Sequence, residues 1–192
     1  KNRAETYKVA LVGYTNAGKS SLMNCLTGAD TLVEDKLFAT LDATVRKIKK
    51  NFPYPVLLSD TVGLINKLPH DLVASFKSTL DEVRSADLLI HVVDLSHPEY
   101  IGQMHTTDDL LRQMGADDID ILIAFNKIDA LPDTEILDQA LHAFPSSVAI
   151  SCKTERGIES LRQKIVNHYE KKLVPYCLEL EHFQAILIQE IR

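Results

Sequence analysis

The sequence predicts an α/β fold with a mainly parallel sheet, because short apolar runs alternate with longer amphipathic stretches along its 192 residues. A second observation is a glycine-rich turn, which follows the first apolar run and opens the first amphipathic stretch. The length fits one domain, since domains usually hold roughly 100 to 200 residues. With 45% hydrophobic and 25% charged residues, the composition is that of an ordinary globular protein.

Six segments are expected to form strands. Five of them are apolar enough to be buried in the sheet, namely Val9–Val12, Pro55–Ser59, Leu88–Val93, Ile119–Phe125 and the shorter Ser147–Ile150. Arg46–Phe52 alternates polar and apolar residues instead, which predicts a half-exposed strand at an edge of the sheet.

Helices are expected between these strands, at Lys19–Leu26, Leu72–Arg84 and about 104–114, 134–142 and 155–170. All of these elements fall within residues 1–173, which are expected to form one domain. Residues 174–192 end on an apolar pattern without a visible partner, so we expect them to open a second, truncated domain. The chain begins on Lys1 rather than Met, which suggests a fragment of a longer protein.

The formal net charge of −6 argues against a surface built as a whole to grip nucleic acid, and no DNA partner is expected. Basic residues do cluster locally, at Lys36, Arg46, Lys47, Lys49 and Lys50. The favoured interpretation is a solvated edge strand protected by its charge. The alternative is a contact patch for an acidic or RNA-containing partner.

The three cysteines, Cys25, Cys152 and Cys177, show neither CxxC spacing nor a histidine cluster, which argues against a metal site or a disulfide framework. They fit a reducing cytosol. The longest apolar runs are far too short to cross a bilayer, and no signal peptide is visible. The sequence therefore predicts a cytoplasmic protein without a transmembrane segment.

The glycine-rich turn matches the pattern GxxxxGK[ST] in the right context, after a buried strand and before a helix. Its glycines let the backbone wrap closely around phosphate oxygens, which the N–H groups at the helix start then bind. Lys19 is expected to neutralise the β- and γ-phosphates during catalysis, and the Ser20 hydroxyl to bind Mg²⁺. The predicted phosphate-binding residues are Gly13, Tyr14, Thr15, Asn16, Ala17, Gly18, Lys19, Ser20 and Ser21.

A second motif indicates which base the protein binds. Asn126, Lys127 and Asp129 follow a buried strand, at the edge where such sheets bind nucleotides. The Asp129 carboxylate can accept hydrogen bonds from the N1–H and exocyclic amine of guanine, whereas adenine would leave it unpaired. Lys127 can lie over the base, and Asn126 can tie this loop to the phosphate loop. Backbone N–H groups of Ser151, Cys152 and Lys153 would complete the pocket around the guanine O6.

A third motif, Asp60-Thr61-Val62-Gly63, ends another apolar strand. Asp60 is placed to hold Mg²⁺ through water, and the Gly63 N–H to contact the γ-phosphate, so that hydrolysis would release the loop that follows. Leu64 stands next, where Ras-like switches carry the glutamine that orients the attacking water. Slow intrinsic hydrolysis is therefore expected.

Between these motifs, the segment Phe38, Ala39, Thr40, Leu41, Asp42 leads to Ala43 and Thr44. A threonine here should complete the Mg²⁺ shell with GTP bound, and spacing alone does not separate Thr40 from Thr44. Two histidines are candidates for a catalytic group. His91 lies inside an apolar strand, which favours a core or sheet-face role, while His70 stays open.

Taken together, these sequence motifs resemble those of the HflX-type GTPases, which are relatives of Era and Obg among translation-associated GTPases. The resemblance rests on GYTNAGKSSL, FATLDATVR, DTVGLINKLPHDLVASFKSTLDEV and NKID, and covers about residues 7–170. It implies a Ras-like P-loop GTPase fold, with a six-stranded, mostly parallel sheet, one antiparallel edge strand and helices on both faces. It also implies that Thr40, the threonine before Leu41, is the Mg²⁺ ligand.

The resemblance implies partners as well. Members of the family bind the large ribosomal subunit, which stimulates their GTPase activity, and are associated with splitting or rescuing stalled ribosomes under stress. They normally carry an N-terminal domain that contacts ribosomal RNA, which is not among these 192 residues. The chain departs from the family at Ala43, where Pro is usual, and at Cys152, where Ala is usual.

The leading hypothesis is thus a monomeric switch enzyme that couples GTP hydrolysis to ribosome engagement, with Lys19, Thr40 and Gly63 as its catalytic groups. The second is a regulatory module whose partner affinity follows the bound nucleotide and whose hydrolysis is incidental, a reading that Leu64 keeps open. A P-loop nucleoside or nucleotide kinase is disfavoured, because no acceptor site or arginine-rich lid is visible.

Overall fold

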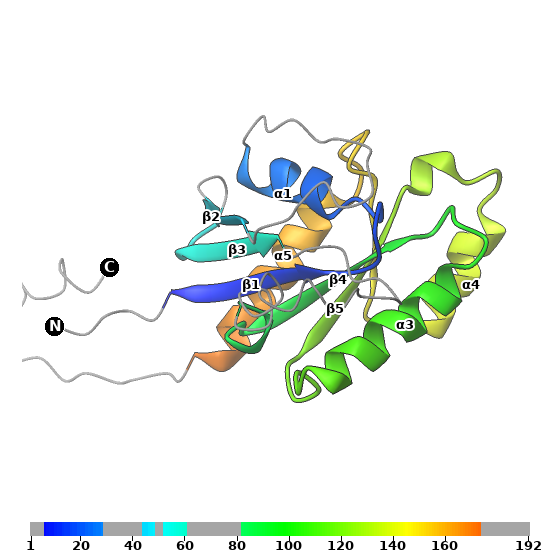
Figure 1. Ribbon diagram of the computed structural model, residues 1–192. Helices are drawn as coiled ribbons and strands as arrows, with labels where there is room; N and C mark the ends of the chain where they lie inside the picture. The colour runs from blue at the N-terminus through cyan, green and yellow to red at the C-terminus, as the bar shows by residue number, and fades with distance from the viewer. Residues whose placement is uncertain (1–5, 29–43, 49–51, 61–81, 174–192) are drawn as a thin grey trace, which may run out of the picture.

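In the computed structural model, the strands form one sheet with the order β2-β3-β1-β4-β5-β6 (Figure 1). The structure describes residues 6–28, 44–48, 52–60 and 82–173. Neighbouring strands pair in parallel except β2 and β3, which are antiparallel, so the predicted sheet with one antiparallel edge strand is confirmed. The strands are β1 (Tyr7–Val12), β2 (Thr44–Ile48), β3 (Val56–Asp60), β4 (Leu88–Asp94), β5 (Ile121–Asn126) and β6 (Val148–Ala149).

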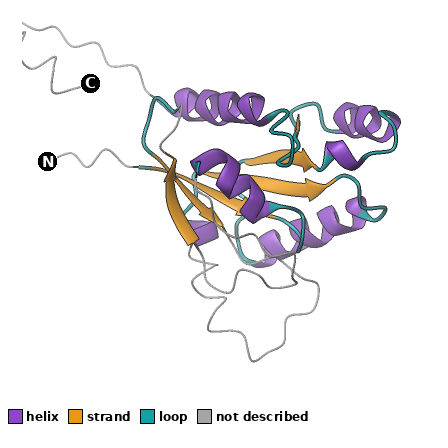
Figure 2. Cartoon of the chain, turned by 90° about the horizontal axis from the view of Figure 1, so that it is seen from above, coloured by secondary structure: helices purple, strands orange, loops and turns teal. Residues whose placement is uncertain are grey.

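Helices lie on both sides of the strands (Figure 2). They are α1 (Lys19–Thr27), α3 (Tyr100–Gln113), α4 (Glu135–Ala143) and α5 (Ile158–Lys172), with the short 3-10 helix η2 (Ile128–Ala130). Residues 82–84 are helical too and end the helix predicted at Leu72–Arg84, most of which lies outside the described residues. In the part of the chain that the structure describes, no helix is both long and apolar enough to span a membrane.

The predicted elements recur with small shifts at their ends. The edge strand predicted at Arg46–Phe52 is Thr44–Ile48, and α3 begins at Tyr100 rather than near residue 104. The first turn of α3 contains the exposed Ile101, and Met104 is the first buried residue of this helix. The apolar spacing therefore detects α3 only from the point where the helix meets the core.

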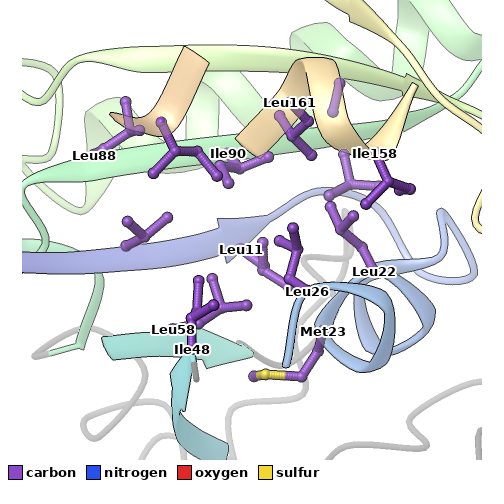
Figure 3. Packing of buried hydrophobic residues seen from close by; sticks show 14 of the residues in the cluster. Leu11, Leu22, Met23, Leu26, Ile48, Leu58, Leu88, Ile90, Ile158 and Leu161 are labelled. Carbon is purple, nitrogen blue, oxygen red and sulfur yellow. The ribbon is translucent and has the colours of Figure 1, made fainter. Parts of the chain in front are cut away.

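One buried cluster fixes the position of α1 (Figure 3). In this cluster, α1 and α5 pack against the same face of the sheet, and each fully buried Leu or Ile stabilises the fold by about 1.5–3 kcal/mol. The packing thereby holds the start of α1, where the glycine-rich turn ends, against the ends of β1 and β3. Its members include Leu22, Met23 and Leu26 of α1, Ile158, Leu161 and Ile165 of α5, and Leu11, Leu58 and Ile90 of the strands.

The edge strand β2 shows the alternation that the sequence predicted. Ile48 is buried, whereas Val45 is 46% exposed. Arg46 is partly buried and Lys47 is exposed on this strand, so two members of the basic cluster lie at the edge of the sheet. The other three members, Lys36, Lys49 and Lys50, lie outside the described residues.

At the amino ends of the strands, polar side chains from separate elements bond to one another. The Tyr7 hydroxyl shares a hydrogen bond with His168 Nδ1, and His168 Nε2 donates to Asp120 Oδ2 at 3.0 Å. Lys172 Nζ donates to the Asp87 carbonyl at 2.9 Å. These contacts fasten the end of α5 to the starts of β1, β4 and β5. We refer to Tyr7, Asp87, Asp120, His168 and Lys172 as the amino-end cluster.

Candidate functional site

The loop between β1 and α1 carries the glycine-rich turn. Gly13 and Gly18 have φ angles of 145° and 97°. A Cβ on Gly13 would lie 2.3 Å from the Val92 carbonyl oxygen, and one on Gly18 would lie 2.2 Å from Asn126 Nδ2. Both positions therefore exclude a side chain, and the loop lies tightly against β4 and β5. The first N–H groups of α1 follow directly, and such groups lack helical partners and can bind an anion.

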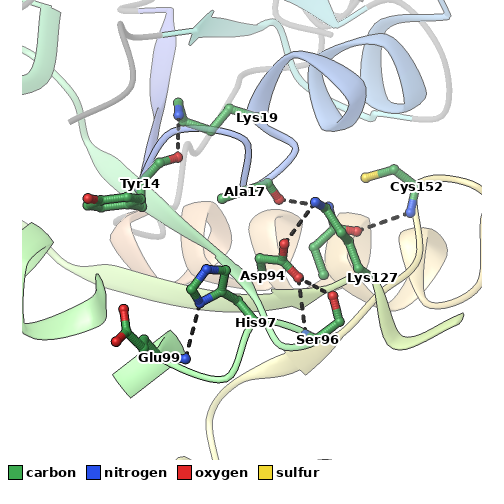
Figure 4. Close-up of polar contacts among 10 residues, drawn as sticks. Tyr14, Ala17, Lys19, Asp94, Ser96, His97, Glu99, Lys127 and Cys152 are labelled. Carbon is green, nitrogen blue, oxygen red and sulfur yellow. Dashed lines mark hydrogen bonds and ion pairs between the residues drawn. The ribbon is translucent and has the colours of Figure 1, made fainter. Parts of the chain in front are cut away.

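Lys19, the first residue of α1, points back into this loop. Its Nζ donates to the Gly13 carbonyl at 3.1 Å. It also donates to the Tyr14 carbonyl at 2.9 Å (Figure 4). Burial lowers the pKa of Lys19 to about 8, against the opposing influence of the Asp60 carboxylate. The lysine charge is thus held in a poorly solvated place, where a bound anion would stabilise it.

Ser20 and Asp60 meet beside Lys19. The Ser20 hydroxyl donates to Asp60 Oδ2 at 2.7 Å. Asp60 is 3% exposed, and its Oδ1 has no hydrogen-bond partner among the residues that the structure describes. Burial raises the pKa of Asp60, while Ser20, Lys19 and Arg46 act to lower it. A buried carboxylate oxygen next to a hydroxyl is the hard oxygen donor set that Mg²⁺ prefers, so these residues fit the predicted ion.

Asn126 joins three loops. Its Nδ2 donates to the Ala17 carbonyl in the glycine-rich turn at 2.9 Å. Its Oδ1 accepts from the Cys152 N–H at 3.2 Å. Asn126 is 2% exposed, so both hydrogen bonds are shielded from water. The expected tie between the NKID segment and the phosphate loop is present (Figure 4).

Lys127 is fixed by a residue that the sequence analysis did not single out. It has a left-handed backbone, with φ 62°, and its Nζ lies 2.8 Å from Asp94 Oδ2. The other carboxylate oxygen of Asp94 accepts from the N–H and the hydroxyl of Ser96, at 3.1 and 2.6 Å. Asp94 ends a buried strand at the same edge as Asp60 and Asn126, and that position was the signal that could have identified it.

Asp129 and Ser151 form the far side of this site. The Ser151 hydroxyl donates to Asp129 Oδ1 at 2.5 Å and accepts from the Thr154 N–H at 3.1 Å. Ser151 is fully buried, whereas Asp129 and Lys153 are exposed. The buried serine therefore orients an exposed carboxylate at the carboxyl edge of the sheet, which is the arrangement that recognition of a base edge requires.

The family model described as "50S ribosome-binding GTPase" matches residues 8–127, from β1 to Lys127 in the NKID segment. The chain belongs to this family.

Within the family, this GTPase domain is similar to curated HflX proteins. It is 46% identical over 189 residues to the GTPase HflX of Gluconacetobacter diazotrophicus, which covers 98% of the chain and 42% of that protein. It is 57% identical over 130 residues to the GTPase HflX of Flavobacterium psychrophilum, covering 67% of the chain and 31% of that protein. The predicted HflX-type GTPase domain is confirmed, and the chain spans less than half the length of these relatives.

A solved structure agrees with the fold of this GTPase domain. The GTP-binding protein of the hyperthermophilic archaeon Sulfolobus solfataricus, in complex with GDP, superimposes with a TM-score of 0.66 at 31% identity. The match covers 86% of this chain and 53% of that one. The predicted Ras-like P-loop architecture is thereby confirmed.

The structure brings most of the predicted site residues of this GTPase domain to the carboxyl edge of one sheet. These are Gly13 to Ser21, Asp60, Asn126, Lys127, Asp129 and Ser151 to Lys153. The remaining predicted residues lie outside the described residues, namely Phe38, Ala39, Thr40, Leu41 and Asp42 of the first switch segment and Thr61, Val62 and Gly63 of the second, with Leu64 and His70 beyond them.

His91 lies within the sheet, in β4, and not in a nucleotide-binding loop. It is 2% exposed in β4, and burial, helped by the Lys19 charge, lowers its pKa to about 4. Its Nδ1 lies 3.8 Å from Asp108 Oδ1, beside a cavity of about 380 Å³ between α3 and β5. The structure therefore supports the sheet-face role over the catalytic one.

Proposed function

We propose that this chain binds guanine nucleotide with Mg²⁺ and hydrolyses GTP to GDP and phosphate. The observation that carries the proposal is the position of Asn126, whose side chain bonds the phosphate loop at Ala17 and the base loop at Cys152. A single buried amide thus fixes the distance between the place for phosphates and the place for a base. The family membership and the GDP complex of the Sulfolobus relative support the same function.

Each end of the site has a defined task. Lys19 and the N–H groups at the start of α1 would bind the β- and γ-phosphates. When Lys19 exchanges its two carbonyl contacts for phosphate oxygens, the negative phosphates would stabilise its buried charge. Ser20 and Asp60 would hold Mg²⁺, together with Thr40 of the first switch segment. When bound, that ion neutralises the charge that develops between the β- and γ-phosphates.

At the other end, Asp129 would select guanine over adenine. Its carboxylate is oriented by Ser151 and can accept two hydrogen bonds from the guanine edge. The predicted donation to the guanine O6 is not supported for two of its three N–H groups: that of Cys152 already bonds Asn126, and that of Ser151 donates to the Arg156 carbonyl at 2.9 Å. Lys127, held by Asp94, would cover one face of the base with its apolar stem.

Titration calorimetry with GDP, a non-hydrolysable GTP analogue and an ATP analogue tests this assignment. We expect guanine nucleotides to bind with a Kd on the order of micromolar, and the ATP analogue not to bind. Asp129→Asn should weaken GDP binding and favour xanthosine diphosphate, because the amide can donate to the C2 oxygen of xanthine. The matched control is Asp118→Asn, an exposed aspartate away from the site. ATP binding as tight as GTP binding would contradict the base assignment.

We propose further that hydrolysis by the domain alone is slow and that the large ribosomal subunit accelerates it. Leu64 supplies no group that could orient a water, and the matching family model is named for binding the 50S subunit. Single-turnover GTP hydrolysis should therefore be faster with large subunits than without them. Equal rates of GTP hydrolysis with and without large subunits would contradict this part of the proposal.

The whole protein would then act as a cytoplasmic, monomeric ribosome-associated factor in the rescue or splitting of stalled ribosomes. Residues 1–173 would form the GTPase domain and residues 174–192 the start of a further segment. The second candidate is a regulatory module whose nucleotide state sets partner affinity and whose hydrolysis is incidental, favoured by Leu64. Nucleotide-dependent subunit binding without any stimulated multiple turnover would select it.

A further inference from the structure

Two cysteines that lie 127 residues apart in the sequence meet beside the base loop. Cys25 belongs to the last turn of α1, and Cys152 directly follows Ser151. The Cys25 thiol donates to the Cys152 carbonyl oxygen at 3.4 Å, which places the two cysteines side by side. Both cysteines are partly exposed and pack on the margin of the core cluster between α1 and α5. This contact lies beyond what cysteine spacing could indicate.

The surroundings make the two thiols unequal. The hydrogen bond from Cys152 lowers the pKa of Cys25, with help from the Arg162 guanidinium, while burial and Glu155 oppose it. The same hydrogen bond, and burial, raise the pKa of Cys152. Arg162 Nη2 also donates to the Cys25 carbonyl at 2.7 Å, which holds its charge near this cysteine. An accessible thiol with a lowered pKa beside a second thiol is the arrangement of a redox-sensitive pair.

We propose that Cys25 and Cys152 are an oxidative modification site that closes to a disulfide when the protein meets a peroxide. The Cys25 thiolate attacks one peroxide oxygen, the O–O bond breaks, and Cys25 becomes a sulfenic acid with release of hydroxide. The Cys152 thiol then attacks the Cys25 sulfur, the S–O bond breaks, and water leaves as the S–S bond forms. In sum, two thiols are oxidised by two electrons and one hydrogen peroxide is reduced to two water molecules.

The disulfide would act on the nucleotide site through the backbone of Cys152. A sulfur–sulfur bond of about 2.05 Å is shorter than a contact between two thiols, so its formation draws Cys25 and Cys152 together. If the backbone of Cys152 is displaced toward α1 in this step, the hydrogen bond from its N–H to Asn126, already 3.2 Å long, lengthens further. Because Asn126 positions both loops, GDP affinity should fall about tenfold, a loss of roughly one hydrogen bond. This consequence, unlike the disulfide itself, rests on the proposed function.

The test uses the full chain with Cys177→Ser, which leaves only the two cysteines of interest. After hydrogen peroxide treatment and blocking of free thiols, peptide mass spectrometry without reductant should find the peptides of Cys25 and Cys152 cross-linked within one chain. In Cys152→Ala, the Cys25 sulfenic acid should persist and react with dimedone. Free thiols at both positions, a sulfinic acid on Cys25 beside a free Cys152, or cross-links between chains would each overturn the proposal.

A second readout separates this inference from the proposed function. The oxidised protein should bind GDP about tenfold more weakly than the reduced one, and Cys25→Ala should bind GDP equally before and after peroxide treatment. By reciprocity, saturating GDP should make the disulfide easier to reduce in a glutathione titration, by about 30 mV for a tenfold coupling. If the disulfide forms after peroxide treatment but the protein does not bind GDP before treatment, the proposed function alone is refuted. Normal GDP binding without any disulfide would refute the modification site alone.

Discussion

The two ends of the sheet differ in how their polar groups are satisfied. In the amino-end cluster, the Tyr7 hydroxyl, the His168 ring and the Asp120 carboxylate bond to one another. At the carboxyl end, Lys19 is buried against neutral carbonyls, and Asp60 keeps a buried oxygen that no described residue bonds. Buried polar atoms without a partner destabilise a fold. The amino end is therefore built for stability, and the carboxyl end for a charged ligand.

This difference also shows in the backbone. The non-glycine residues with positive φ angles in the described part of the chain, Asn16, Lys127 and Glu155, all lie at the carboxyl end. Such conformations persist only where the surroundings impose them, and they commonly mark binding loops. A ligand that bonds the exposed N–H groups and neutralises Lys19 would stabilise this end through mass action. Changes at the two ends should accordingly separate binding from folding.

The largest expected effect comes from Lys19→Met, which keeps the length of the side chain and removes its charge. Binding of GDP and of a GTP analogue should weaken about a hundredfold, because the phosphates lose a charge-assisted partner. The free protein should be at least as stable as the wild type, since a buried charge is gone. Calorimetry and thermal unfolding measure the two effects. A variant that both binds normally and unfolds earlier would show that Lys19 is a structural lysine.

Gly18→Ala comes next, because it damages both folding and binding. The new Cβ would meet Asn126 Nδ2 at 2.2 Å on a backbone with φ 97°. We expect a loss of about 2–4 kcal/mol in the free energy of unfolding, together with weaker GDP binding as Asn126 is displaced. The matched control is Gly28→Ala, where φ is 67° and nothing lies within 4 Å of the new Cβ.

Urea unfolding of the two glycine variants checks this prediction. Gly28→Ala should lose only about 1 kcal/mol, the strain of a left-handed alanine, and should leave GDP affinity unchanged. Equal losses in both variants would mean that backbone conformation, and not the contact with Asn126, makes Gly18 necessary.

Much of the carboxyl end could be predicted from the sequence, because its motifs are local. The strand, turn and helix around Gly13 to Ser20 lie in one short stretch, and the period of the apolar residues marks both elements. The contacts of Lys127 with Asp94 and of Cys25 with Cys152 depend instead on strand order and register. The pairing of β4 with β5 places Asp94 opposite Asn126 and therefore next to Lys127. The sequence around Asp94 does not indicate that Lys127 is its partner.

The amino-end cluster was not predictable for the same reason. Tyr7 and His168 lie 161 residues apart, and each reads locally as an ordinary member of an amphipathic element. They meet because α5 runs back along the sheet after β6 and brings its last turns over the start of β1. Local pattern therefore identifies a motif with its own chemistry more readily than a contact assembled by the completed fold.

The pH dependence of the carboxyl end follows from Lys19. Its pKa is about 8 in the folded protein and 10.5 in the unfolded chain, so the unfolded state holds more protons between these values. The stability of the free protein should therefore rise with pH in this window and gain nothing from Lys19 below pH 8. Lys19→Met should lack this rise.

Nucleotide binding should change in the opposite direction in the same window. Phosphates require the charged lysine, so GDP binding takes up a proton once free Lys19 has lost its own. Affinity should fall with increasing pH above 8, by at most about tenfold per pH unit. Calorimetry in buffers of different ionisation enthalpy measures the proton uptake, and an affinity that is flat up to pH 9.5 would contradict a lowered Lys19 pKa.

The smallest effect is expected at the amino end, from Tyr7→Phe. The change removes the hydroxyl that bonds His168 and keeps the ring, which packs edge-on against Tyr169 with ring centroids 4.9 Å apart. The free energy of unfolding should fall by about 1–2 kcal/mol, because His168 Nδ1 loses its partner in a half-buried site. GDP affinity should stay at the wild-type value, since Tyr7 lies at the opposite end of β1 from the glycine-rich turn.

Tyr54→Phe is the matched control for this last change. Tyr54 also packs on Tyr169, at 4.5 Å between ring centroids, but its hydroxyl makes an exposed 3.3 Å hydrogen bond to Glu170. Losing a bond that water can replace should leave urea unfolding unchanged. If Tyr7→Phe weakened GDP binding while Tyr54→Phe did not, the two ends of the sheet would be coupled through β1. The separation of a stabilising end from a binding end would then be wrong.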